Sequence, residues 1–247
     1  MVEPIFVGRS LSCHFRGVTA LTNLNFAIYP GEKVGLIGAS GAGKSTLLSL
    51  LNSQQQPTAG ALLAWGEPLA TLSPRRRRRI QQQIGTIYQQ FNLVESLAVI
   101  HNVNAGHLGR WSFPKAAFSL IVPGDRPQAL AALQQVGIPE KLFARTSELS
   151  GGQKQRVALA RVLVQDPAVI LADEPIASLD PQLSQEMMDL LVHLCETRGK
   201  TLVVSLHSLE FARSHCDRLI GLKAGKILFD QPSATVSDAQ IAHLYGA

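Results

Sequence analysis

The chain of 247 residues is poor in cysteine and contains no long hydrophobic run. Its three cysteines, Cys13, Cys195 and Cys216, are odd in number and follow no metal-ligand spacing, which argues against a disulfide framework and against a zinc site. We expect all three to be small buried residues. No apolar run approaches the ~20 residues that cross a bilayer. Because Met1–Ser10 also lacks the charged-then-apolar layout of a secretion signal, we expect a globular cytosolic protein.

Repeats and low-complexity segments are absent too, apart from a run of arginines at Arg75–Arg79. The hydrophobic content of 46% and the length of the chain support a sizeable buried core. Much of the formal net charge of +5 lies in the arginine run, which follows Ser73-Pro74, a pair that suits a helix cap and first turn. Such a run can bind nucleic acid or lipid, but we expect the more frequent case, a solvated helix end.

The stretch around which the chain is organised is Lys33–Leu48. Within it, the apolar run Val34–Ile37 predicts a buried strand, and Ser45–Leu51 has the composition of a helix. The loop between them matches the phosphate-binding pattern G-x-x-x-x-G-K-[ST] in full. Its residues are Gly38, Ala39, Ser40, Gly41, Ala42, Gly43, Lys44 and Ser45.

This pattern has a direct physical meaning for binding a phosphate chain. Gly38, Gly41 and Gly43 let the backbone turn tightly, so that consecutive N–H groups point inward at phosphate oxygens. The positive end of the following helix adds to that field. We expect Lys44 to reach the β- and γ-phosphates of a nucleotide and the Ser45 hydroxyl to ligate Mg²⁺.

A second glycine-containing turn, Leu149–Gln153, has the sequence LSGGQ and runs into the helical sequence KQRVALARVLV. A hydroxyl and two glycines at a helix N-terminus present N–H groups outward and form a second anion site. A helix cap would account for Ser150 but not for the paired glycines Gly151 and Gly152. One nucleotide cannot easily occupy both anion sites within one subunit.

Acidic and imidazole side chains follow two further apolar strands. Asp173 and Glu174 come after the predicted strand Ala168–Ala172. Asp173 is placed to hold Mg²⁺ through its water shell, and Glu174 can polarise a water for attack on a γ-phosphate. His207 follows the predicted strand Thr201–Leu206, which brings it to the same edge of the sheet and favours contact with the γ-phosphate.

The remaining pattern sets the fold class. Weak alternation over Val7–Pro30 predicts an antiparallel strand pair, and short strands are expected at Ala61–Trp65 and Ile84–Tyr88. A helical block runs from Val99 to about Gln165 and is interrupted by prolines and glycines, and Pro181–Glu196 predicts a further helix. Strands that alternate with helices predict an α/β fold with a mainly parallel sheet covered on both faces.

Taken together, these motifs resemble the ATP-binding subunit of an ABC transporter over essentially the whole chain. The glycine-rich loop of that family matches Gly38–Thr46, its signature sequence matches Leu149–Gln153, and its second acidic motif matches Val169–Glu174. Its switch histidine matches His207. The three motifs are specific jointly rather than singly.

The resemblance assigns roles to further residues. The Q-loop glutamine, a Mg²⁺ ligand in this family beside Ser45 and Asp173, falls on Gln89, with Gln90 as an adjacent competitor. The aromatic residue that stacks on adenine falls on Phe15, where tyrosine is more usual; phenylalanine keeps the stacking face and lacks the hydroxyl. The family's D-loop matches the run Ser178, Leu179 and Asp180.

The resemblance implies a P-loop NTPase (RecA-like) core, an N-terminal antiparallel β subdomain and an inserted α-helical subdomain. All belong to a single ABC ATPase domain over 1–247, with the core and β subdomain in 1–88 and 166–247 and the Q-loop and helical subdomain in 89–165. It also implies two copies arranged head to tail, with each ATP between the Lys44 loop of one copy and the Ser150 loop of the other. Glu174-assisted hydrolysis of ATP, with Mg²⁺, would then release the pair.

Partners and location follow from the same resemblance. The helical block and the Gln89 loop resemble the part that grips two membrane-spanning permease subunits, at the cytoplasmic face of the cell membrane, where the chain would be a peripheral protein. A substrate-binding protein would be an indirect partner. We expect the arginine run to lie on the side away from the membrane-contacting loop.

Three stretches look most like ATP-binding subunits of phosphonate importers, and related importers of phosphite and hypophosphite are similar: Ile84–Ser112, Ala172–Pro181 and Val204–Asp230. Gln231-Pro232 departs from the Gly-Pro expected there. One alternative is an ABC transporter ATPase for another substrate class, such as amino acids or lipoproteins. The other is a soluble ABC ATPase acting on DNA or ribosomes, but such proteins usually carry two cassettes or a coiled-coil insertion, so we expect no nucleic-acid partner.

Overall fold

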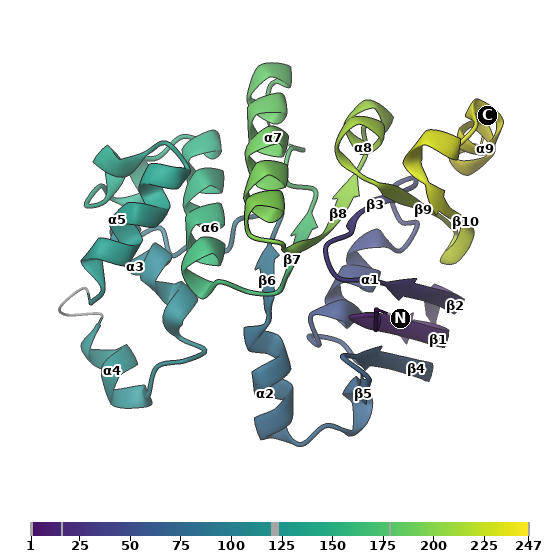
Figure 1. The fold of residues 1–247 in the computed structure, drawn as a ribbon, viewed down its shortest axis with the longest axis horizontal. Coiled ribbons are helices and arrows are strands. Elements are labelled where there is room, and N and C mark those ends of the chain that lie inside the picture. The colour runs from purple at the N-terminus through teal and green to yellow at the C-terminus, as the bar shows by residue number, and fades with distance from the viewer. Residues whose placement is uncertain (1, 16, 120–123, 178, 247) are drawn as a thin grey trace.

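The computed structural model describes residues 2–15, 17–119, 124–177 and 179–246. In this part of the chain, the central sheet has six strands in the order β10-β9-β3-β8-β7-β6 (Figure 1). The pairs from β9 to β6 are parallel, and only β10 joins the edge in antiparallel orientation. The predicted mainly parallel sheet is therefore confirmed. The strands are β3 (Lys33–Ile37), β6 (Ile84–Ile87), β7 (Val169–Asp173), β8 (Thr201–Leu206), β9 (Arg218–Lys223) and β10 (Lys226–Pro232).

Both faces of this sheet are buried, because successive side chains of a strand point to opposite sides. Val169 and Leu171 of β7 belong to a core that contains Leu47 of α1 (Lys44–Leu51). Ile170 and Ala172 of the same strand belong to a second core. The second core contains apolar residues of α6 (Gly151–Gln165), α7 (Pro181–Thr197) and α8 (Leu209–His215). The apolar strand sequences thus reflect burial on two sides.

An antiparallel sheet packs against the far side of α1, with strand order β2-β1-β4-β5. It confirms the predicted strand pair near the N-terminus. Its strands are β1 (Phe6–Phe15), β2 (Val18–Ile28), β4 (Ala59–Ala64) and β5 (Glu67–Pro68). A 3₁₀ turn, η1 (Leu69–Thr71), leads from this sheet to α2 (Pro74–Gln82), which begins after the predicted cap Ser73 and carries the arginine run.

The helical block is inserted between β6 and β7 and lies to one side of the central sheet in Figure 1. It comprises α3 (Val99–Asn104), η2 (Ala105–His107), α4 (Phe113–Phe118), α5 (Arg126–Gln135), η3 (Pro139–Lys141), η4 (Thr146–Glu148) and α6. After β10 the chain ends in η5 (Ser233–Thr235) and α9 (Asp238–Tyr245). Among the described residues, no helix is long and apolar enough to cross a membrane.

The three cysteines are buried, as the sequence predicts. Cys13 packs in the antiparallel sheet, Cys195 lies on α7, and Cys216 follows α8. Burial raises the pKa of Cys195 and of Cys216 to about 12, since a thiolate would be poorly solvated in these apolar surroundings. Burial also raises the pKa of Cys13.

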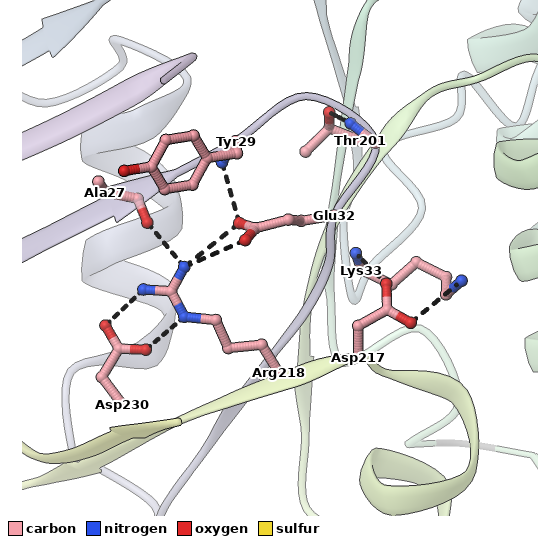
Figure 2. Close-up of polar contacts among 9 residues, drawn as sticks. Ala27, Tyr29, Glu32, Lys33, Thr201, Asp217, Arg218 and Asp230 are labelled. Carbon is pink, nitrogen blue, oxygen red and sulfur yellow. Dashed lines mark hydrogen bonds and ion pairs between the residues drawn. The ribbon is translucent and has the colours of Figure 1, made fainter. Parts of the chain in front are cut away.

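A charged cluster centred on Arg218 ties the two sheets together (Figure 2). The guanidinium donates through Nε and Nη2 to the two carboxylate oxygens of Asp230 on β10, at 2.5 and 2.7 Å. Its Nη1 donates to the carbonyl of Ala27 on β2, at 2.9 Å, and lies 3.3 Å from Glu32. The hydrogen bonds to Asp230 and the nearby carboxylates raise the pKa of Arg218. One side chain therefore joins β9, β10 and β2.

We expect Arg218→Met to destabilise the fold by about 2–4 kcal/mol, because it leaves two partly buried carboxylates without their cation. Arg218→Lys should recover only part of this, since an ammonium cannot form the forked contact. The matched control is Arg213→Met, which removes an ion pair to the exposed Asp238 and a hydrogen bond to the Val236 carbonyl and should cost about 1 kcal/mol. Urea unfolding of the three variants measures the difference, and equal losses for Arg218→Met and Arg213→Met would contradict the bridging role.

Candidate functional site

The register of the parallel strands brings the predicted site residues to one edge of the sheet. Ile37, the last residue of β3, lies opposite Leu206, the last residue of β8. Ser205 lies opposite Asp173, the last residue of β7. The loop that follows Ile37, the acids at the end of β7 and His207 therefore all emerge at the carboxyl ends of adjacent strands, where ligands bind in open α/β sheets.

The phosphate-binding loop has a backbone that only glycine fits at two positions. Gly38 has a φ of 149°, and a Cβ built on it would lie 2.2 Å from the carbonyl oxygen of Leu222. Gly43 has a φ of 107°, and its Cβ would lie 2.6 Å from Leu21. The loop therefore packs tightly against β9 and β2, and its shape is set by the fold before any ligand arrives.

Lys44 is buried at the start of α1 and points back into the loop. Its ammonium donates to the carbonyl of Gly38 at 2.8 Å and to that of Ala39 at 3.2 Å. Burial lowers the pKa of Lys44, while the carboxylates of Glu174 and Asp173 act in the opposite direction. The Lys44 ammonium is thus held by the first two residues of the loop, near the carboxylates of Asp173 and Glu174.

A cavity of about 340 Å³ opens over this loop. Gln89 is among its lining residues, and the adjacent Gln90 is not. The structure also brings Ala20 of β2 to the wall, which the sequence did not indicate. The full lining is Ala20, Ser40, Gly41, Ala42, Gly43, Lys44, Ser45, Thr46, Gln89, Glu174 and His207.

Asp173 and Glu174 are held by a short network beneath the cavity. The Ser45 hydroxyl lies 3.1 Å from Oδ1 of Asp173, and the Ser205 hydroxyl donates to the same oxygen at 2.7 Å. Ser205 also accepts a hydrogen bond from the backbone N–H of Glu174 at 2.8 Å. Glu174 has a φ of 47°, a left-handed conformation that is unfavourable for this residue type. The fully buried Ser205 therefore fixes the peptide that carries both acids.

His207 contacts Glu174 directly, with Nε2 and Oε1 2.5 Å apart. The glutamate side chain is 16% exposed and the imidazole 48% exposed, so the carboxylate is the more protected of the pair. A second cavity of about 360 Å³ touches the other side of this pair and includes Leu179 in its wall. The sequence placed His207 at the sheet edge but did not predict its contact with Glu174.

The turn Leu149–Gln153 lies apart from this cavity, at the N-terminus of α6. Ser150 accepts from the N–H of Gln153 at 3.3 Å, and the Gln153 side chain accepts from the N–H of Ser150 at 3.1 Å, which forms a capping box. The fold does not require glycine at the next two positions. A Cβ on Gly151 would meet nothing within 4 Å, and one on Gly152 would make an ordinary 3.6 Å contact with Leu183.

The structure describes two of three further predicted residues. Phe15 ends β1 with 39% of its surface exposed and is not among the residues that line the cavity. Asp180 caps α7 by accepting from the N–H of Leu183 at 2.9 Å. Ser178 lies outside the described residues.

The model of the family described as ABC transporter matches residues 21–177, which is more than half of the chain. This chain belongs to the ABC transporter family. A phosphonates import ATP-binding protein of Nostoc sp. is 45% identical over 96% of this chain and 90% of its own length. A protein of the same description from Stutzerimonas stutzeri is 45% identical over 94% of this chain and 86% of its own length.

Solved ABC transporter cassettes share the fold. The structure of cbiO1 from Clostridium perfringens, described as part of an ABC transporter complex, has a TM-score of 0.81 and 29% identity and covers 98% of this chain and 94% of its own. A dimeric cassette in a post-hydrolysis state, bound to ADP and phosphate, also has a TM-score of 0.81, with 31% identity over 92% of this chain and 98% of its own. The predicted P-loop fold class is therefore confirmed.

Among the residues that sequence reasoning missed, Ser205 is the most informative. Its strand reads TLVVSL, and all six positions are buried. A hydroxyl within such an apolar strand needs a hydrogen-bond partner, because an unpaired buried polar group is costly. The signal was therefore present in the sequence, but the partner, at the end of the neighbouring strand, was visible only once the register was known.

We expect Ser205→Ala in this ABC cassette to lower the free energy of unfolding by about 1–3 kcal/mol, because Asp173 and the N–H of Glu174 both lose a buried partner. Ser49→Ala is the control: its hydroxyl donates to the Thr46 carbonyl within α1, and its loss should change stability by less than about 0.5 kcal/mol. Urea unfolding of both variants compares them. Parent-like stability of Ser205→Ala would show that the network does not fix the acidic peptide.

Proposed function

We propose that this chain is the ATP-hydrolysing subunit of an importer for phosphonate or a related reduced phosphorus oxyanion, phosphite or hypophosphite. The observation that carries the substrate class is the near-full-length similarity to phosphonates import ATP-binding proteins. The cassette does not touch the transported molecule, so its own cavity supports ATP hydrolysis and not the choice of substrate.

In this proposal the loop Gly38–Thr46 holds the phosphates of ATP. Its N–H groups and the N-terminus of α1 supply a positive field, and the Lys44 ammonium turns from the carbonyls of Gly38 and Ala39 to the β- and γ-phosphates. Phe15, exposed at the end of β1, offers an apolar face on which adenine stacks.

The oxygen atoms beside the loop fit a magnesium ion. The Ser45 hydroxyl and the Asp173 carboxylate lie 3.1 Å apart, and Gln89 adds an amide oxygen to the same cavity. Hydroxyl, amide and carboxylate oxygens suit Mg²⁺, which in nucleotide sites takes few protein ligands and keeps phosphate and water oxygens. We assign Ser45 and Gln89 as ligands and Asp173 as a ligand through water. When bound, the ion neutralises charge on the phosphates.

Glu174 is the proposed catalytic base. Its carboxylate lies in the cavity wall beside Lys44, at a position from which it can orient a water for attack on the γ-phosphate. The His207 contact restrains that carboxylate, and the imidazole, about half exposed, remains available to the γ-phosphate. The left-handed conformation of Glu174 and its hydrogen bond to Ser205 fix the direction from which the carboxylate approaches.

The turn Leu149–Gln153 is proposed to complete the site of a second copy. The capping box explains Ser150 and Gln153 within one subunit, but the space around Gly151 shows that the fold itself tolerates a side chain there. An anion brought by a partner would need that close approach to the backbone. We therefore propose a head-to-tail pair in which ATP lies between the Lys44 loop of one copy and the Ser150 loop of the other. The D-loop residues Leu179 and Asp180 would lie between the copies.

Helix α6 connects the turn Leu149–Gln153 to the loop that follows Gln89. Ten residues after Gly151, Arg161 donates to the carbonyls of Phe91 and Asn92, at 2.9 and 2.7 Å, just beyond Gln89. Both of those loop residues have positive φ values, 59° and 48°, so the guanidinium holds the loop in an unfavourable shape. A shift of the signature turn toward a partner's nucleotide therefore displaces the loop after Gln89 as well.

A groove of about 470 Å³ is the proposed contact for a permease subunit. It runs between α2 and the start of the helical block, and its rim includes the half-exposed Leu108. The chain would bind there as a peripheral subunit on the cytoplasmic face, as one of two copies under two permease subunits. A substrate-binding protein would deliver the ligand from the other side. The lining residues are Arg78, Gln81, Gln82, Ala105, Gly106, Leu108, Gly109, Arg110 and Gln165.

The test of this function is ATP hydrolysis by the cassette purified with its neighbouring permease and substrate-binding proteins in liposomes. We expect methylphosphonate or phosphite, loaded on the binding protein, to stimulate hydrolysis, and an amino acid to have no effect. Glu174→Gln should nearly abolish turnover, because the amide keeps the shape but loses the basic oxygen, while ATP-dependent dimers accumulate on size exclusion. Stimulation by amino acids alone would reject the substrate class, and turnover near the parent rate in Glu174→Gln would reject the base.

Lys44→Ala and Ser150→Arg should fail differently. The first removes a phosphate contact from the subunit's own site, so ATP affinity of the monomer falls by about 10-fold or more. The second obstructs only the face offered to a partner, so monomer binding survives while dimer-dependent hydrolysis is lost. Fluorescent-nucleotide titration at low protein concentration and hydrolysis at high concentration separate the two effects. Equal loss of monomer binding in both variants would contradict the head-to-tail arrangement.

A further inference from the structure

Helix α2 presents an unusually dense positive charge to solvent. Its sequence, PRRRRRIQQ, has five consecutive arginines, and Ile80 is the one residue of the helix that is buried. Among the described residues, only Arg76 of the five forms an ion pair, with Glu67 at 3.1 Å. Arg77 and Arg78 donate to backbone carbonyls, and these contacts leave their charge uncompensated. The helix cap is formed by the Ser73 side chain and the backbone N–H of Arg76, so it does not need this charge.

Helix α4 presents the opposite anomaly, since two of its apolar side chains are largely exposed and, within the described part of the chain, it contributes no residue to either core. None of its six residues is buried. Phe113 is 86% exposed and Phe118 is 62% exposed, the two highest values among the phenylalanines of the described chain. Lys115, between them, lies 3.5 Å from Asp125 and 4.7 Å above the Trp111 ring. A phenylalanine left in water at both ends of one short helix contributes nothing to the stability of the fold.

The two helices lie on the same side of the molecule, at the lower end in Figure 1. Contacts between α2 and the segment just before α4 hold them together. Arg78 donates to the carbonyl of Leu108 at 3.3 Å, and the Gln82 side chain donates to the carbonyl of Gly109. The sequence led us to expect the arginine run on the side away from the membrane-contacting loop. We revise that expectation, because α2 forms one wall of the groove that we assign to the permease, and α4 comes in the chain directly after residues of the other wall.

We propose that α2 and α4 together form a docking surface for an anionic lipid membrane. The arginines attract negatively charged headgroups, and the phenylalanines of α4 enter the boundary between headgroups and acyl chains. An anionic membrane explains both exposed groups, since a partner that offers only negative charge would explain the arginines but not the phenylalanines. The carboxylates that touch this surface are Glu67, opposite Arg76, and Asp125, which lies 3.5 Å from Lys115 and 3.9 Å from His107, so a positive excess remains.

A membrane fits the shape of this surface better than a nucleic acid does. Proteins that bind single strands stack bases on aromatic residues within a positively charged groove. Here neither phenylalanine is among the residues that line the groove, and both stand on a helix that has no buried residue. The inference goes beyond the proposed function, because it concerns binding by the cassette alone, without permease or ATP hydrolysis.

The experiment is co-sedimentation of the full chain with vesicles of phosphatidylcholine, with and without one quarter phosphatidylglycerol, at low and high salt. We expect binding only to the anionic vesicles, and weaker binding at high salt. Arg75→Gln/Arg79→Gln should weaken binding about 25-fold, or about fivefold per charge. Phe113→Ser/Phe118→Ser should weaken it by at least about tenfold at low salt, since the apolar anchor is lost.

Matched control variants remove exposed cations and an exposed phenylalanine that lie outside α2 and α4. Arg9→Gln/Lys226→Gln removes two exposed charges on β1 and β10, and Phe143→Ser removes another exposed phenylalanine. We expect parent-like vesicle binding from both, and unchanged nucleotide binding from every variant, which shows that each is folded. Failure to bind anionic vesicles, or equal loss in test and control variants, would overturn the proposal. So would tighter binding to single-stranded RNA than to vesicles, with loss only in the arginine variant.

Discussion

In the core sheet, β8 lies between β3 and β7 and runs parallel to both, so the residues that follow the three strands emerge at one edge. A slip of one residue in this register would turn every side chain of a strand to the opposite face. Both cores depend on that alternation, since Val203 packs with α1 and Val204 packs with the helices of the other face. The same register places His207 against Glu174. The register of β3, β8 and β7 therefore determines both the packing of the two cores and the arrangement of the site residues.

The second organising feature is the way in which α6 joins distant parts of the chain. Its first turn presents the glycines of the signature sequence, its middle packs into the helical block, and Arg161 holds the loop beyond Gln89. Lys154, on the same helix, forms an ion pair with Glu95 further along that loop, at 2.6 Å. Burial lowers the pKa of Arg161, and its carbonyl partners compensate part of the lost hydration. Side chains at two positions of the helix thus bind the loop.

Much of this could be predicted from the sequence, because the decisive residues are neighbours in the chain. The phosphate-binding loop and the pair Asp173-Glu174 each lie within one short motif, and buried parallel strands are recognisable as apolar runs. Contacts between distant segments could not be predicted in this way. Ser205 joins Asp173 only through the strand register, and the bridge from Arg218 to Asp230 depends on a hairpin whose turn, Ala224-Gly225, has positive φ at both residues. The exposure of the α4 side chains likewise depends on the positions of segments that are distant in the sequence.

The burial of all three native thiols has a practical consequence for experiments on motion. With pKa values near 12 for Cys195 and Cys216, these groups stay protonated and shielded at neutral pH and react slowly with maleimides. A cysteine introduced at an exposed position, such as Gly151 or Phe118, would be far more reactive in the folded protein than the native thiols. Spin labels or fluorophores can therefore be attached to the natural background sequence, and the approach of two cassettes can be measured without first removing a native residue.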